Sequence, residues 1–137
     1  TSIEKTENYK VSPFVVKCND HNHSVFKDEY FAPILAIYPY STSKTDETLK
    51  LCASGNRYAL TGSVFSKREN LVNHADKLLK AKTGNFYINC RSTGSVVANQ
   101  PFGGSGKSGT NDKAGDMNIL YRLFNQRNIK INQAPLI

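Results

Sequence analysis

The chain of 137 residues is long enough for one domain or for part of a larger one. Its hydrophobic content of 39% argues against intrinsic disorder, and no apolar run approaches the ~20 residues that a membrane-spanning helix needs. The formal net charge is +7, with −1 on residues 1–50 and +8 on the remainder.

The first third of the chain predicts two strands and a helix. Residues 13–18 place β-branched and aromatic side chains after a proline, which is typical of a short strand. Residues 33–38 form a nearly continuous apolar run, which favours a strand covered on both faces, as in a parallel sheet. A helix is predicted over residues 43–54, with Thr45 as its N-cap and Gly55 closing it.

The middle of the chain repeats this alternation. A strand is predicted over residues 59–66 and another over residues 85–89. Between them, residues 69–82 form the clearest helix of the chain, and we expect Gly84 to stop it. Its apolar face has the spacing i, i+4, i+7, i+8, carried by Leu71, Ala75, Leu78 and Leu79.

A long glycine-rich loop follows, from residue 92 to residue 115, and loops of this length inside a domain usually serve a function. Residues 118–124 predict a short helix, and residues 128–132 alternate as a terminal strand. Together the elements predict a βαβαβ arrangement of the α/β class, with right-handed crossovers.

The residues Gly106-Lys107-Ser108 match the last three positions of the phosphate-binding P-loop motif G-x-x-x-x-G-K-[ST]. The leading glycine of that motif is replaced by Pro101, which offers no N–H, and the residues after Ser108 make a poor helix start. We therefore do not expect a nucleotide P-loop here.

Four potential metal ligands crowd into one polar segment: Cys18, Asp20, His21 and His23. A zinc site needs about four ligands and usually a second ligand pair elsewhere, which the sequence does not offer. A plain polar turn is the favoured interpretation, and no metal is expected. The three cysteines, Cys18, Cys52 and Cys90, are widely spaced, which indicates free thiols in a reducing compartment.

The basic residues are dispersed and form no block of like charge beyond Lys67-Arg68. This pattern favours a solvated face over a nucleic-acid surface, so neither nucleic acid nor a membrane is expected as a partner. Residues 28–33 place a carboxylate and an aromatic ring directly before a strand. They fit either a turn with Phe31 in the core or a carboxylate that binds a ligand hydroxyl beside the ring.

Several segments in order resemble the aldehyde dehydrogenase family. Residues 29–35 (EYFAPIL) are similar to its E-x-F-G-P-[VI]-L segment, and residues 58–65 to its Y-G-L-[TS]-[GA] strand. Residues 84–89 and 100–105 match its G-N-x-x-[IV]-N and P-F-G-G segments. Residues 92–97 and 108–115 resemble the delta-1-pyrroline-5-carboxylate branch, which oxidises glutamate semialdehyde to glutamate. The likeness runs from about residue 13 to residue 130.

The resemblance assigns roles to five residues. Glu29 corresponds to the glutamate that binds the nicotinamide-side ribose of NAD, with Phe31 packing nearby. Gly94 and Ser95 lie where the family binds the substrate carboxylate through backbone N–H groups, and Phe102 corresponds to an aromatic wall against the aldehyde stem. Ala32 stands where the family has glycine, which predicts a shifted turn beside Glu29 and Phe31.

The resemblance also implies that this chain is a C-terminal segment without the nucleotide-binding domain, the nucleophilic cysteine or the general-base glutamate. Residues 1–125 would complete the catalytic domain, and residues 126–137 would form an oligomerisation strand and tail, pairing between subunits through Asn128–Asn132. The start at Thr1 fits the expectation that other polypeptide precedes it.

The function expected from this resemblance is that of part of a mitochondrial-matrix enzyme of proline catabolism. It would act on a small aldehyde with NAD, and the chain alone would be inactive. The alternative is a non-catalytic truncated relative that acts as an interaction module on full-length subunits.

Overall fold

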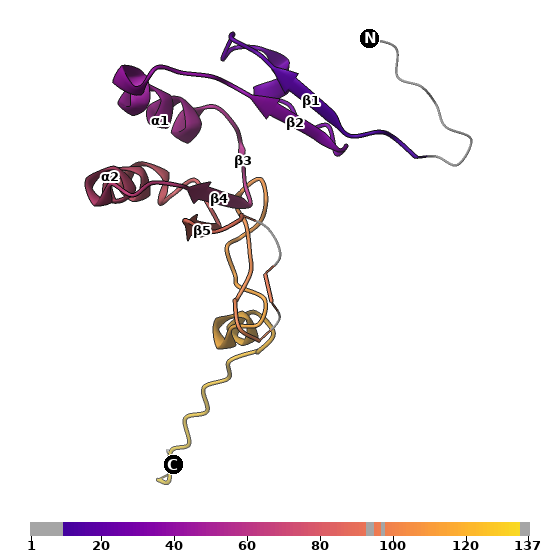
Figure 1. Cartoon of the computed structure of the whole chain (residues 1–137). Helices are drawn as coiled ribbons and strands as arrows, with labels where there is room; N and C mark the ends of the chain where they lie inside the picture. Colours follow the sequence, from indigo (N-terminus) through magenta and orange to yellow (C-terminus); the bar gives the residue numbers. More distant parts are fainter. Residues whose placement is uncertain (1–9, 93–94, 97, 135–137) are drawn as a thin grey trace.

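Six short strands pair as three separate two-stranded sheets in the computed structural model, which describes residues 10–92, 95–96 and 98–134 (Figure 1). The strands are β1 (Phe14–Lys17), β2 (Ile34–Ile37), β3 (Tyr58–Ala59), β4 (Thr61–Val64), β5 (Asn85–Ile88) and β6 (Ser105–Gly106). Strands β1 and β2 are parallel, as are β4 and β5, whereas β3 and β6 are antiparallel. The helices and the parallel pairs agree with the predicted α/β class.

Most of the buried apolar residues of the described fold lie on helix α2 (Glu69–Leu79), which connects the parallel strands β4 and β5. The helix packs on β4, and Val72 and Ala75 are buried. Ala75 is 0% exposed, as its place on the predicted apolar face requires, and the three leucines of that face are partly buried. Periodicity therefore identified the buried side of α2 correctly.

The prediction that Gly84 stops this helix is wrong. The helix ends at Leu79, where the backbone N–H of Lys80 donates to the carbonyl oxygen of Asp76. Gly84 lies directly before β5 and is pressed against other backbone: a Cβ there would lie 2.1 Å from the carbonyl oxygen of Gly103. Its lack of a side chain serves a close approach rather than a helix cap.

The predicted strand over residues 59–66 is divided. Residues 58–59 pair with β6, whereas residues 61–64 pair with β5, so Leu60 marks a change of sheet. Strand β2 pairs with β1 and not with β4, and the predicted continuous βαβαβ sheet is not formed among the described residues. Sequence periodicity cannot show this, because pairing partners are chosen by tertiary contacts.

The β1–β2 sheet is parallel, as predicted, with Phe14 opposite Ile34 and Lys17 opposite Ile37. Its apolar side chains are not covered on both faces: Leu35 is 58% exposed, and Ile34 and Ile37 are also exposed. The expected double burial is therefore wrong for the chain as described. Two strands alone have no layer above or below them, and only packed elements can cover such a sheet.

Helix α1 (Thr45–Ser54) begins after the 3-10 turn η2 (Thr42–Lys44). Thr45 is the first helical residue and not the N-cap, and its Oγ1 donates to the carbonyl oxygen of Thr42 at 2.7 Å. Gly55 is the C-cap, as expected, and its N–H donates to the carbonyl oxygen of Leu51. Helix α1 packs on α2 (Figure 1).

The glycine-rich segment folds back on the β4–β5 unit. Strand β6 pairs with β3, and Phe102 and Ala114 form an isolated antiparallel bridge. The short helix expected over residues 118–124 is the 3-10 helix η3 (Met117–Arg122), where the carboxylate of Asp116 accepts from the N–H of Asn118.

Residues 124–134 run away from the rest of the described chain (Figure 1). Ile131 is 80% exposed, and residues 128–132 form no strand in this chain. A strand is defined by its ladder, and an alternating segment without a neighbour remains extended backbone. No helix within the described ranges is long and apolar enough to cross a membrane.

Candidate functional site

Glu29 lies in the loop between the 3-10 turn η1 (Ser24–Phe26) and β2. The turn is held by His23, whose Nδ1 accepts from the backbone N–H of Val25 at 3.1 Å. Glu29 is exposed and lines a hollow of about 420 Å³. The other lining residues are Lys27, Asp28, Gly55, Arg57, Tyr58 and Lys107. The hollow thus combines three cationic and two carboxylate side chains, which suits a polar ligand with hydroxyl or anionic groups.

Phe31 projects into solvent. Its ring is 94% exposed, and its φ of +48° is in the left-handed region, which costs a residue with a side chain of the order of 1 kcal/mol or more. The strain falls on Phe31 itself and not on Ala32, the residue that stands in the glycine position of the family pattern. The open interpretation that placed Phe31 in the core is therefore wrong for the described chain.

The substrate-loop prediction is only partly within the described residues, because Gly94 lies outside them. Ser95 is partly buried, and its hydroxyl donates to the carbonyl oxygen of Gln100 at 2.6 Å. The N–H groups of Asn99 and Gln100 both donate to the carbonyl oxygen of Val96. Hydrogen bonds thus tie Ser95 and Val96 to Asn99 and Gln100, directly before Pro101 and Phe102.

Phe102 is partly buried, and its backbone is held on both sides. Its N–H donates to the carbonyl oxygen of Ala114 at 3.0 Å, and the N–H of Ala114 donates back at 2.9 Å. The side-chain amide of Asn85 donates to the carbonyl oxygen of Pro101 at 3.0 Å. The anchored backbone fixes the position from which the Phe102 ring extends, as an aromatic wall requires.

The hollow beside Glu29 contains none of the other predicted site residues that the structure describes. The glycine-rich loop reaches the hollow beside Glu29 through Lys107, whereas Phe31, Ser95 and Phe102 do not line that hollow. The roles that the resemblance assigns to Glu29, Gly94 and Phe102 also imply that the three residues line one cleft, and this stays a prediction.

Gly106-Lys107-Ser108 does not have the geometry of a P-loop. Gly106 ends β6, the N–H of Lys107 donates to the carbonyl oxygen of Arg57, and the Ser108 hydroxyl accepts from the N–H of Ala59. The next helical segment is the 3-10 helix η3, which begins at Met117. The backbone groups that would cradle a phosphate thus bind β3 and its neighbour instead.

The segment with Cys18, Asp20, His21 and His23 is a hydrogen-bonded turn, in which Asp20 Oδ1 accepts from the N–H of Asn22 at 2.9 Å. Among the described residues, no three His, Cys, Asp or Glu side chains are grouped to hold a metal ion.

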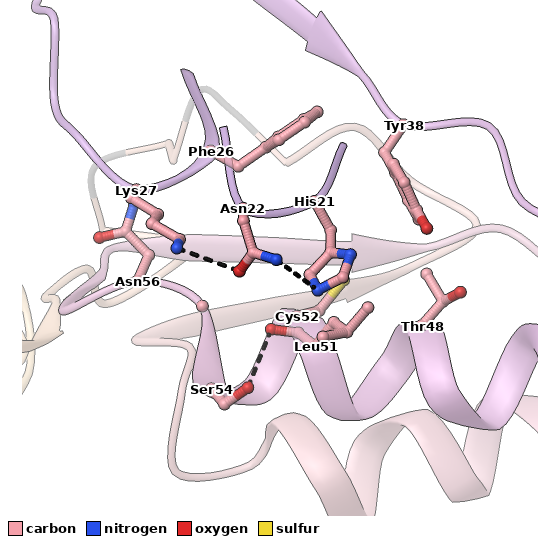
Figure 2. A pocket seen from close by; sticks show the side chains of 11 residues that line it. His21, Asn22, Phe26, Lys27, Tyr38, Thr48, Leu51, Cys52, Ser54 and Asn56 are labelled. Atoms are coloured by element: carbon pink, nitrogen blue, oxygen red, sulfur yellow. Dashed lines mark hydrogen bonds between the residues drawn. The ribbon is translucent and has the colours of Figure 1, made fainter. Parts of the chain in front are cut away.

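Sequence reasoning missed a second cavity, of about 410 Å³, between this turn, Tyr38 and helix α1 (Figure 2). The rings of His21 and Phe26 meet that of Tyr38 edge-on, with centroids 6.3 and 6.1 Å away. Partial desolvation raises the pKa of the Cys52 thiol, which lines this cavity. The thiolate is the reactive form of a cysteine, and a raised pKa makes it scarcer at Cys52. The walls come from three separate segments, which no local pattern connects.

Helix α2 connects the parallel strands β4 and β5, as in proteins of the α/β class. The sequence model of the aldehyde dehydrogenase family matches residues 2–129, and the chain belongs to this family. The predicted family is thereby confirmed.

The similar curated proteins identify the branch. The chain is 48% identical over 126 residues to the mitochondrial delta-1-pyrroline-5-carboxylate dehydrogenase of Dictyostelium discoideum and 44% identical over 128 residues to that of Homo sapiens. These alignments cover 92% and 93% of this chain but 23% of each relative. The chain thus spans less than a quarter of the relatives' length.

Solved structures give the same result. The delta-pyrroline-5-carboxylate dehydrogenase of Mycobacterium tuberculosis bound with NAD superposes with a TM-score of 0.74 at 39% identity, covering 88% of this chain and 21% of that one. The corresponding enzyme from Thermus with bound NAD gives a TM-score of 0.72 at 30% identity, with coverages of 88% and 22%.

Proposed function

We propose that this chain forms part of an NAD-dependent dehydrogenase that oxidises L-glutamate gamma-semialdehyde to L-glutamate in proline catabolism. The observation that carries the proposal is 44–48% identity to delta-1-pyrroline-5-carboxylate dehydrogenases over more than nine-tenths of the chain. Because the relatives are named mitochondrial, we place the protein in the mitochondrial matrix.

In this proposal Glu29 binds the nicotinamide-side ribose of NAD, and Phe31 packs beside it. A carboxylate only accepts hydrogen bonds, so its two oxygens suit two neighbouring ribose hydroxyls. The exposure of Glu29 and the hollow next to it leave room for such a ligand. The exposed ring of Phe31, held by a left-handed backbone, is available to contact a flat ring.

The glycine-rich loop would bind the substrate. Gly94 and Ser95 would take the carboxylate of the semialdehyde through backbone N–H groups, and Phe102 would cover its aliphatic stem. The support is the hydrogen bond from the Ser95 hydroxyl to the carbonyl oxygen of Gln100, two residues before the fixed backbone of Phe102. Burying the stem excludes water next to the covalent thioester formed in this chemistry.

The chain contributes no nucleophile in this scheme, so alone it should not turn over substrate. We would test this by combining it with a Dictyostelium enzyme truncated before the aligned 126 residues. NADH formation from the semialdehyde is expected only when both pieces are present. Turnover by the 137-residue chain alone, or a folded mixture with none, contradicts the proposal.

In an active mixture, Glu29→Gln should raise the KM for NAD by about tenfold, since a charge-assisted hydrogen bond becomes a neutral one. Glu47→Gln is the matched control, because Glu47 is also exposed but lies on α1. An equal effect of the two variants would remove the assignment of Glu29.

Residues Asn128–Asn132 are proposed to add a strand to another subunit and so to assemble a homo-oligomer. The extended, exposed course of this segment and its apolar Ile129 and Ile131 support such pairing. Ile131→Pro removes a ladder donor and should lower the sedimentation-derived mass. A monomer at high concentration for the unaltered chain argues against it.

The exposed terminal segment also supports the second candidate, a non-catalytic module that docks on full-length subunits. A pull-down that captures full-length enzyme, combined with no gain of activity in the two-piece mixture, would favour this role.

A further inference from the structure

The ammonium group of the partly buried Lys113 lies among backbone carbonyls. Its Nζ donates to the carbonyl oxygens of Gly84 and Gly103, the latter at 2.6 Å, and is 3.4 Å from Asn85 Oδ1. An ammonium has three N–H donors and no acceptor, so these three oxygens can satisfy all of its protons. Burial lowers the pKa of Lys113.

The same contacts enclose the backbone of Phe102. On one side, Asn85 binds the carbonyl oxygen of Pro101 and accepts from the N–H of Gly103 at 3.4 Å. On the other side, Phe102 exchanges two hydrogen bonds with Ala114, the residue directly after Lys113. The residues Gly84, Asn85, Phe102, Gly103 and Lys113, here named the Lys113 junction, thus bring the start of β5 and the glycine-rich loop together.

We propose that Lys113 is the positioning residue that fixes Phe102 against β5, by clamping the carbonyls of Gly84 and Gly103 onto one ammonium group. The inference that this positioning of Phe102 affects substrate binding rests on the proposed function. The hydrogen bonds of Lys113 do not depend on it. Lysine suits it because three oxygens converge on one point. The planar guanidinium of arginine spreads its donors over a fork, and methionine ends one atom short of the ammonium and has no donor.

The clamp has a direct spectroscopic signature in the unaltered chain. We expect measurable couplings across the hydrogen bonds from Lys113 15Nζ to the carbonyl carbons of Gly84 and Gly103, with slow exchange of the ammonium protons. A rapidly exchanging ammonium without these couplings would overturn the proposal, whatever any variant does.

The second test is amide hydrogen exchange in Lys113→Met, with Lys82→Met as the control, since Lys82 is exposed in the turn after α2. Loss of the charge-assisted bonds should accelerate exchange at the N–H groups of Phe102 and Ala114 by about tenfold or more. Exchange in α2 at Val72 should stay within about twofold. Unchanged exchange at Phe102, or an equal increase at Val72, contradicts a positioning role.

Rescue separates the ammonium from the side-chain volume. In a background with Cys18, Cys52 and Cys90 changed to serine, Lys113→Cys can be aminoethylated to restore an ammonium of nearly the same length. Exchange at Phe102 should return to within about twofold of the background protein. No return after complete alkylation counts against the clamp.

These outcomes are independent of the proposed activity. If Phe102→Ala leaves semialdehyde oxidation by the two-piece mixture unchanged, the role of Phe102 in substrate binding fails, while the couplings and the exchange pattern still decide the role of Lys113.

Discussion

The β1–β2 sheet and the Lys113 junction are held in opposite ways. In the sheet, a parallel ladder pairs the backbone groups, but apolar side chains such as Val15 and Leu35 remain exposed. In the junction, the side chains of Asn85 and Lys113 bind backbone carbonyls and so connect β5 with the glycine-rich loop. Gly84 has no side chain, which allows the two backbone segments to touch. Figure 1 shows the two regions in different parts of the chain.

The difference shows what each type of contact can supply. A two-stranded ladder satisfies hydrogen bonds but gains little without apolar burial, so the β1–β2 sheet depends on whatever covers it. All hydrogen-bonding groups of the junction belong to this chain, so the junction should keep its geometry when no other chain is present. The following variants test this contrast, from the largest expected effect to the smallest.

Gly84→Ala should have the largest effect. The new Cβ would lie 2.1 Å from the carbonyl oxygen of Gly103 and 2.8 Å from that of Leu60, both backbone atoms. We expect a loss of about 3 kcal/mol in the free energy of unfolding, measured by urea denaturation. Gly115→Ala is the control: its Cβ would meet nothing within 4 Å, and its φ of +84° should cost about 1 kcal/mol. Equal losses would mean that the close approach at Gly84 does not persist in solution.

Asn85→Ala should rank second, at about 2 kcal/mol, because it leaves the carbonyl of Pro101 and the N–H of Gly103 without their partner. Thermal unfolding followed by circular dichroism measures the loss. Asn73→Ala, on the exposed side of α2, should cost nothing, since alanine is the better helix former. A neutral result for Asn85→Ala would show that the junction is not held by polar contacts.

Asp46→Asn should have a smaller, pH-dependent effect. Hydrogen bonds from Lys50 at 2.7 Å and His74 at 2.6 Å lower the pKa of Asp46 from 3.8. A carboxylate with a lowered pKa stabilises the fold above its unfolded pKa, and this contribution is lost as the pH falls through the folded value. The difference in Tm between the unaltered chain and Asp46→Asn should therefore disappear in acid, below 3.8. Because all three side chains are exposed, salt should also reduce it. A difference that grows in acid would contradict this.

Leu35→Ser should have the smallest effect, within about 0.5 kcal/mol, because the leucine is already 58% exposed. The same urea experiment on Val72→Ser should show about 2 kcal/mol or more, since Val72 is buried beside Ala75. If Leu35→Ser costs as much as Val72→Ser, the β1–β2 sheet is covered in solution. A concentration-dependent Tm would then identify a second copy as the cover.

Local patterns predicted the fold where local forces decide it. The apolar spacing on α2 identified Ala75 as core, and the strands at residues 14–17, 34–37 and 85–88 fall inside their predicted ranges. The motifs were sufficient to recognise the family, which the comparisons confirm. The roles of Glu29 and Phe102 came from resemblance and remain predictions.

The failures in strand pairing and at the Lys113 junction share one cause. The division at Leu60, the short strand β6 and the clamp of Lys113 depend on groups up to about 50 positions apart in the chain, such as the Ser108 hydroxyl that accepts from the N–H of Ala59. No periodicity within one segment contains such a contact. The exposed faces of β1–β2 also could not be anticipated, since an apolar run indicates a tendency to be buried but not what buries it.

The amino-acid sequence by itself determined the family, the positions of the main helices and strands, and the buried side of α2, because spacing and short motifs encode these directly. Tertiary structure alone decided which strands pair, why residue 84 must be glycine and which carbonyl oxygens bind the ammonium group of Lys113. These depend on the close approach of distant backbone segments, whose carbonyl groups must find hydrogen-bond donors when they leave water.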